Sequence, residues 1–424
     1  MVTSAKSHSF NMMMIVIMAI LVITPLFSRT LHPALAFFAF VIWAADSMIK
    51  NGYSFLFGDK FGIGKWWTIL IVWEIVLSIV GYSTTEPNTF IVRRLPVYLT
   101  PIIGCYCVRV YSAKELKTLF RLLFTIILIN LFSNIVIWIV HPEIYEGITR
   151  FDAVQIRTNA GETGFVHDVL FLAPILYIIV KSDFSKGKKW FYFAIIALSV
   201  LYISVINSRA TAFFILIFYV FAFFFVTRAN RSHLHGFSRI VLYVVALALV
   251  IFFSVPILEL LAGYLPERLV VRIESTINSI NGRQIVEDNE GSLYARWMLS
   301  QVSLGTWLSN PIYFFIGKGE DLAASGRIDD LVALGIGQHS EFVDFLAKYG
   351  LLGAFLLFKS LKSTFNFILS IGDNTIIKSY VKIVMIGFLI MSVLNNTLIA
   401  DNVIVIFVIL PVVVFLVQNK MSAR

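Results

Sequence analysis

Long apolar runs separated by mostly short polar connections make up most of the chain. A helix needs about 20 apolar residues to cross the roughly 30 Å hydrocarbon core of a bilayer, and many of these runs approach that length. The pattern therefore predicts an all-α integral membrane protein with about twelve transmembrane helices. The predicted spans cover residues 10–27, 31–49, 66–82, 90–109, 119–140, 163–180, 189–206, 211–227, 239–262, 341–358, 378–396 and 402–417.

Two connections, 141–162 and 263–339, are much longer than the others. The second is not of low complexity, because "SLYARWMLSQVSLGTWLSNP" (292–311) spaces its apolar residues as a helix lying along a membrane face would. Asn310-Pro311 is expected to end that helix. We therefore expect a folded helical cap on the bundle. The predicted domains are 1–262 (transmembrane helices 1–9), 263–340 (one large periplasmic helical loop) and 341–424 (transmembrane helices 10–12).

Lysine and arginine mark every second connection between the predicted spans. Cytoplasmic loops of membrane proteins carry such an excess, so both termini are predicted to be cytoplasmic and the cap to lie outside. The formal net charge of +9 accompanies 58% hydrophobic residues, which favours this topological origin over nucleic-acid binding. The basic connections hold Lys50, Lys60 and Lys65; Arg109, Lys114, Lys117 and Arg121; Lys181, Lys186, Lys188 and Lys189; Arg228, Arg231 and Arg239; and Lys359, Lys362 and Lys378.

Four arginines lie on the predicted outer side, where the positive-inside rule does not predict basic residues. Arg93 and Arg94 open a predicted span, Arg209 occupies the tight turn "NSRAT", and Arg296 lies in the cap helix. They either reach lipid headgroups or bind an anion, and guanidinium groups hold phosphate oxygens in a bidentate way. No compact carboxylate cluster is present to hold a metal, although Asp329-Asp330 and Glu287-Asp288 are adjacent acids, so no metal and no other cofactor is expected.

His339 follows the long outer segment and directly precedes a predicted span. A histidine there either caps the helix as a polar surface residue or accepts a proton from a substrate hydroxyl. Ser340 is the expected N-cap of this helix, with Glu341 in its first turn.

Three segments together resemble the superfamily of O-antigen ligases and Wzy-type polysaccharide polymerases. "HSEFVDFLAKYGLLG" fits the family pattern of His, then Asn, Ser or Gln, then nine residues, then Gly-x-x-Gly, here His339, Ser340, Gly350 and Gly353. "NSRATAFF" around Arg209 is similar to the arginine turn of the family. "ARWMLSQVSLGTWLSNPIYFFIGKG" (295–319) is similar to its loop helix, followed by a glycine turn.

The resemblance implies a fold like that of the GT-C membrane glycosyltransferases, and transfer of a glycan from undecaprenyl diphosphate at the periplasmic face of the bacterial inner membrane. It further implies inversion at the anomeric carbon with neither a nucleotide sugar nor a metal. Arg209 and Arg296 would hold the diphosphate and His339 would activate the acceptor hydroxyl. Arg93, Arg94, Arg157 and Ser340 are the further substrate-binding candidates, whereas Glu162, His167 and Asp168 depart from the family pattern and receive no role.

The leading expectation is a polymerase that moves the growing glycan onto a new lipid-linked repeat unit. A ligase that delivers the same glycan to lipid A core shares these motifs and stays open as the alternative. A lipid-linked oligosaccharide flippase is the third hypothesis. A transporter is expected to place its charged site near mid-membrane, whereas the four arginines lie at one face. The expected partners are the undecaprenyl-diphosphate-linked glycan, the acceptor glycan lipid, inner-membrane lipids and a chain-length regulator.

Overall fold

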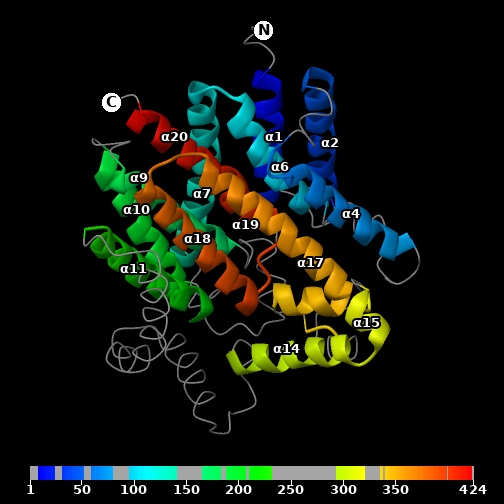
Figure 1. The fold of residues 1–424 in the computed structure, drawn as a ribbon. Helices are drawn as coiled ribbons and strands as arrows, with labels where there is room; N and C mark the ends of the chain where they lie inside the picture. Colours follow the sequence, from blue (N-terminus) through cyan, green and yellow to red (C-terminus); the bar gives the residue numbers. More distant parts are fainter. Residues whose placement is uncertain are drawn as a thin grey trace.

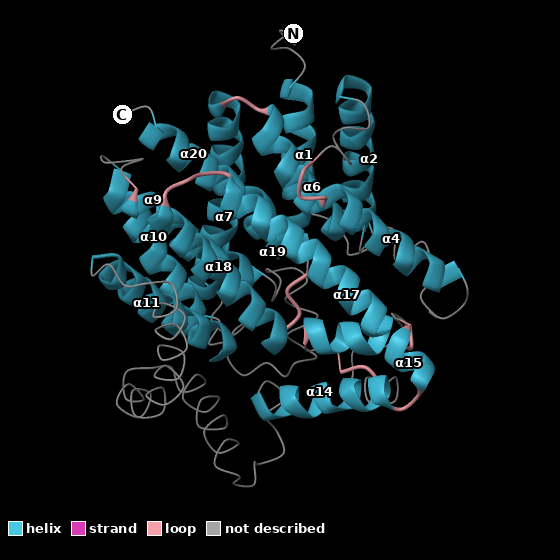
Figure 2. Ribbon diagram, in the orientation of Figure 1, coloured by secondary structure: helices cyan, strands magenta, loops and turns pink. Residues whose placement is uncertain are grey.

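The computed structural model is helical throughout the residues that it describes, and no strand occurs among them (Figure 1; Figure 2). Most helices pack into one bundle, and a small group lies across one end of it (Figure 1). The described residues are 8–23, 31–51, 59–79, 95–140, 165–182, 188–206, 210–231, 293–319, 335–337, 340–398 and 400–422.

The helices follow the apolar runs of the sequence. Those before the long outer segment are α1 (His8–Ile23), α2 (Leu31–Asn51), α4 (Ile63–Ile79), α6 (Leu95–Val110), α7 (Ala113–Val140), α9 (Phe165–Lys181), α10 (Lys189–Leu201) with the π-helical turn η3 (Tyr202–Ile206), and α11 (Ala210–Arg231). Those within and after it are α14 (Leu293–Leu308), α15 (Pro311–Phe315), α17 (Glu341–Ser370), α18 (Thr375–Leu394), and the continuous α19 (Ala400–Ile404), η5 (Val405–Ile409) and α20 (Leu410–Ser422).

Every predicted span except 239–262 overlaps a described helix, and 239–262 lies outside the described residues. Within the described part of the chain, three helices are long and apolar enough to cross a membrane: Ala113–Val140, Thr375–Leu394 and Asn402–Lys420. The all-α prediction is confirmed over the described residues, and these apolar helices support membrane association. The number of spans and the domain boundaries stay predictions.

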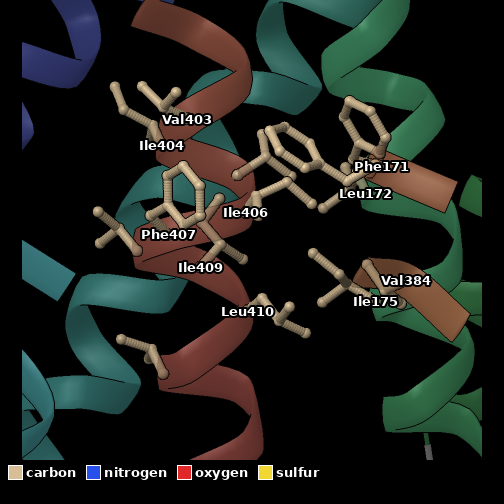
Figure 3. Packing of buried hydrophobic residues seen from close by; sticks show 14 of the residues in the cluster. Phe171, Leu172, Ile175, Val384, Val403, Ile404, Ile406, Phe407, Ile409 and Leu410 are labelled. Carbon is tan, nitrogen blue, oxygen red and sulfur yellow. The ribbon is translucent and has the colours of Figure 1, made fainter. Parts of the chain in front are cut away.

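The C-terminal helices α19, η5 and α20 form the centre of the bundle. In the membrane-length window of Asn402–Lys420, 83% of residues are buried, against 33% for Ala113–Val140. A helix that is apolar on every side is stable when other helices surround it, and this one contacts α1, α6, α7, α9 and α17. In Figure 3, Ile406 and Leu410 lie on the side of the central helix that faces Leu172 and Ile175 of α9.

A proline shapes this central helix and a glycine fits against it. Pro411 has no N–H to offer the carbonyl of Phe407 four residues earlier, and the π-helical turn Val405–Ile409 ends two residues before it. Gly104 of α6 packs against that carbonyl so closely that a Cβ at position 104 would overlap the Phe407 oxygen. The two backbones can approach each other because residue 104 has no side chain.

Gly104→Ala is therefore expected to destabilise the protein by about 1–3 kcal/mol, because the added methyl group forces α6 away from η5. Thermal unfolding of the detergent-solubilised protein, followed by size-exclusion chromatography, measures this change. Gly305→Ala in α14 is the matched control, since a Cβ there meets no atom within 4 Å. A Gly104→Ala protein that unfolds at the wild-type temperature would contradict the close packing.

Hydrogen bonds join helix ends that the charge pattern assigns to the same side of the membrane. Near the predicted cytoplasmic side, Asn11 Nδ2 donates to Ser47 Oγ at 3.2 Å and to Tyr106 Oη at 3.1 Å. These three residues lie in the start of α1, the end of α2 and the end of α6. Toward the other side, Asn130 Nδ2 of α7 donates to the carbonyl of Ile23 at 2.9 Å. The start of α1 therefore lies beside the ends of α2 and α6, which the charge pattern assigns to the same side.

The predicted cap helix is present as α14. It ends at Leu308, just before Asn310-Pro311, and Asn310 Oδ1 accepts the Ile312 N–H at 2.8 Å to begin α15. Leu299 is buried on one side of α14, whereas Trp297 and Leu308 are more than 60% exposed. This apolar exposed side is what a helix lying along a membrane face requires.

Candidate functional site

Buried ionisable side chains gather at two helix starts. Of the buried Asp, Glu, Lys and His residues that the structure describes, all except Glu74 belong to the start of α9 or the first segment of α17. Burying such groups in an apolar bundle is costly, so a cluster of them indicates a structural or functional requirement. The clustered residues are His167, Asp168, Glu341, Asp344 and Lys348.

Asp344 and Ser303 form a relay between α17 and the cap. The Ser303 hydroxyl donates to Asp344 Oδ1 at 2.6 Å and accepts the Gly337 N–H at 2.9 Å. The other carboxylate oxygen of Asp344 accepts the Ser340 N–H at 3.0 Å. One buried carboxylate and one buried hydroxyl therefore hold the backbone on both sides of the dipeptide 338–339. They also fasten that backbone to α14.

Glu341 holds the loop between α18 and α19. Its Oε2 accepts the N–H of Thr397 at 3.2 Å and the N–H of Leu398 at 3.1 Å. A carboxylate that accepts two backbone N–H groups fixes a loop whose donors are otherwise unsatisfied in a buried place. The first residue of α17 thus supports the loop that leads into the central helix. We call the assembly of this loop (395–398), the starts of α9 and α17, and Ser303 the polar junction.

His167 joins α9 to the polar junction. Its Nε2 lies 3.0 Å from Nδ2 of Asn395, within hydrogen-bond distance, and the tautomer of the ring sets which atom donates. His167 is 2% exposed and Asp168 is fully buried. The sequence left both residues without a role, and the structure places His167 in a buried contact between helices. Glu162 lies outside the described residues.

α17 is broken at Gly350, within the Gly-x-x-Gly part of the sequence motif. Gly350 has φ 63°, which separates Glu341–Tyr349 from the long remainder of the helix. The break frees the carbonyls of Ala347 and Lys348, and these accept the N–H groups of Lys318 at 2.8 Å and Gly319 at 2.9 Å. The first segment of α17 lies beside α14, and the remainder runs along the bundle (Figure 1). The predicted span 341–358 is therefore not one continuous helix.

Only part of the predicted site falls on described residues. Ser340 occupies the N-cap position with Glu341 in the first turn, as predicted, but its hydroxyl does not cap the helix. That hydroxyl is buried and makes no hydrogen bond to any described residue. Arg296 lies in α14, but its side chain lies outside the described residues, as do Arg93, Arg94, Arg157, Arg209 and His339 as whole residues.

Sequence reasoning missed the relay and the loop contact. Asp344 resembles an ordinary first-turn acid that complements the helix dipole, and Ser303 resembles a small residue of a cap helix. The available signal was Asp344 itself, an acid flanked by apolar residues in "EFVDFLA". Such an acid needs a buried partner if its helix is enclosed. Asn395 and Thr397 carried no comparable signal.

The role that the contacts of the polar junction allow is to hold the backbone around it in place. It fixes the residues on either side of positions 338–339, and it joins them to the helix that carries Arg296. Among the described residues no group of three or more His, Cys, Asp or Glu side chains could hold a metal ion. Comparison of the chain with known proteins gives no family: no family model matches it, and no curated protein matches it.

Proposed function

We propose that this protein is a membrane-embedded, inverting glycosyltransferase that polymerises a surface polysaccharide. It transfers the growing glycan from undecaprenyl diphosphate to the end of a new lipid-linked repeat unit. The proposal begins from the three motifs around Arg209, Arg296 and His339, which resemble those of the O-antigen ligase and polymerase superfamily.

Each proposed role follows from the charge that the reaction develops. Arg209 and Arg296 hold the diphosphate and stabilise the negative charge that grows as it leaves. His339 accepts the proton of the acceptor hydroxyl. Arg93, Arg94, Arg157 and Ser340 complete the substrate contacts.

The reaction is a single displacement. The acceptor oxygen forms a bond to the anomeric carbon while the bond from that carbon to the diphosphate oxygen breaks, so the configuration inverts. The proton passes to His339 and the leaving group is undecaprenyl diphosphate. Neither a metal nor a covalent intermediate on the protein takes part in this proposal.

The observation that carries the proposal is the relay of Asp344 and Ser303. A general base must be held within hydrogen-bond reach of the proton that it removes. The relay fixes Gly337 and Ser340, which flank the dipeptide containing His339, against the helix that contains Arg296. If His339 only capped the helix at the protein surface, its neighbours would not need a buried carboxylate and a buried serine to hold the backbone on both sides.

The same proposal includes a membrane arrangement of twelve spans, a GT-C-like fold, cytoplasmic termini and a periplasmic site in the bacterial inner membrane. The helix starts and loop of the polar junction all belong to the side that the charge pattern predicts to be outer. The exposed apolar residues of α14 support a cap resting on that membrane face.

The test is a strain that lacks the gene for this chain, complemented with the wild-type protein and examined by gel for surface glycan. The expected result is a ladder of chain lengths that is lost in the null strain, which then carries single repeat units on the lipid core. If long chains accumulated on undecaprenyl diphosphate in the null strain, the protein would be the ligase and not the polymerase. Lipid-linked repeat units trapped on the cytoplasmic side would indicate a flippase and overturn the proposal.

A further inference from the structure

A groove runs along the outside of the bundle between α9, α10 and α11. Its volume is about 660 Å³, and apart from Lys181 and Thr227 its lining is apolar or aromatic. It lies away from the residues of the polar junction, none of which lines it. The lining includes Pro174 and Tyr177 of α9, Phe193 of α10, and Leu216 and Phe223 of α11.

The length of the groove matches one leaflet of a bilayer. Leu216 and Thr227 mark its extent on α11, and at 1.5 Å per residue they are about 16 Å apart along the helix axis. Half of a hydrocarbon core of roughly 30 Å is about 15 Å. A single acyl chain of one leaflet therefore fits the apolar part of the groove.

The polar end of the groove is positively charged. Lys181 lines this end, with its ammonium 5.3 Å from the centre of the Tyr177 ring. Lys188 and Lys189 begin α10 at the same end of the α9–α10 pair, and Thr227 lies there on α11. The charge pattern of the sequence places this end on the cytoplasmic side.

We propose that this groove is a binding site for an anionic phospholipid of the cytoplasmic leaflet. One acyl chain lies along α9, α10 and α11, and the phosphate lies at Lys181. An apolar slot of one-leaflet length with cations only at the headgroup end is complementary to such a lipid in both shape and charge. The inference rests on the membrane-spanning arrangement of these helices, and it is independent of the proposed glycosyltransferase activity.

The test is native mass spectrometry of the full-length, detergent-purified protein titrated with phosphatidylglycerol or with phosphatidylcholine of the same acyl chains. Wild type is expected to bind one phosphatidylglycerol with preference over phosphatidylcholine. Lys181→Gln is expected to weaken phosphatidylglycerol binding about fivefold and to leave phosphatidylcholine binding unchanged, since one lysine near the headgroups contributes about that much. Val220→Trp, which fills the groove from an exposed position, is expected to weaken both.

Two matched controls separate the groove from the general surface. Lys359 also lies over aromatic rings, those of Trp66 and Phe355, but does not line the groove, so Lys359→Gln should keep the wild-type preference. Val393 is exposed on α18 outside the groove, so Val393→Trp should bind lipid as wild type does. An unchanged preference in Lys181→Gln, or unchanged binding in Val220→Trp, would overturn the proposal. Displacement of phosphatidylglycerol by equimolar undecaprenyl phosphate would assign the groove to an isoprenoid instead, and so overturn it too.

Discussion

His339→Ala is expected to reduce glycan transfer by about 10²–10⁴-fold, because a positioned general base contributes about that factor. The acceptor hydroxyl would then have to lose its proton to water while it attacks the anomeric carbon. Binding of the lipid-linked donor should change little, since the proposal assigns the diphosphate to Arg209 and Arg296. Transfer from a purified lipid-linked donor to a labelled acceptor lipid, at saturating and at limiting donor, separates these two effects.

The control for this variant is His235→Ala, which removes a histidine from a predicted cytoplasmic loop and should leave transfer unchanged. Both proteins must be present in the membrane at the wild-type level before rates are compared. A His339→Ala protein with wild-type turnover would exclude a general base at this position. The proposed roles of Arg209 and Arg296 would then need a separate test.

Asp344→Ala is expected to lower turnover by as much as about 10²-fold although Asp344 has no proposed contact with substrate. Misplacing a catalytic group by about 1 Å can cost that much. The substitution leaves the Ser303 hydroxyl and the Ser340 N–H without their acceptor, and each buried unsatisfied group costs about 1–3 kcal/mol. Turnover per folded molecule, with the folded fraction measured by size-exclusion chromatography, reports positioning separately from stability.

Asp344→Asn refines this experiment. The amide keeps the size of the carboxylate and one acceptor oxygen, so it should retain intermediate turnover. Asp373→Ala is the matched control, because Asp373 is fully exposed and pairs only loosely with Lys378 at 3.7 Å. If Asp344→Ala and Asp344→Asn were both fully active per folded molecule, the relay would be a structural contact without any influence on the site.

The sequence was sufficient for the helices because membrane spans are defined by composition and length alone. It predicted α7, α18 and the C-terminal helix, and also the end of α14 before Asn310-Pro311. Each of these depends on local residues: an apolar run, or a proline that cannot continue a helix.

The sequence was not sufficient for the break in α17 or for the relay. Gly350 in "KYGLLG" is compatible with a continuous membrane helix, and only the neighbouring segment 317–319 makes the break stable by satisfying two carbonyls. Ser303 and Asp344 are far apart in the chain, so no local pattern connects them. The N-cap position of Ser340 was predicted correctly, whereas nothing in the sequence indicated that its hydroxyl would leave the helix start uncapped.

The position of the central helix has a consequence for how the protein is made. α19, η5 and α20 leave the ribosome after every other described helix, yet they are the segment around which α1, α6, α7 and α9 pack. During synthesis, the faces of the earlier helices that will contact the central helix must therefore first contact lipid or the insertion machinery. Shortening the chain from this side would remove its centre, so a nascent protein arrested before Asn402 would expose the faces of α1, α6, α7 and α9 that this segment covers.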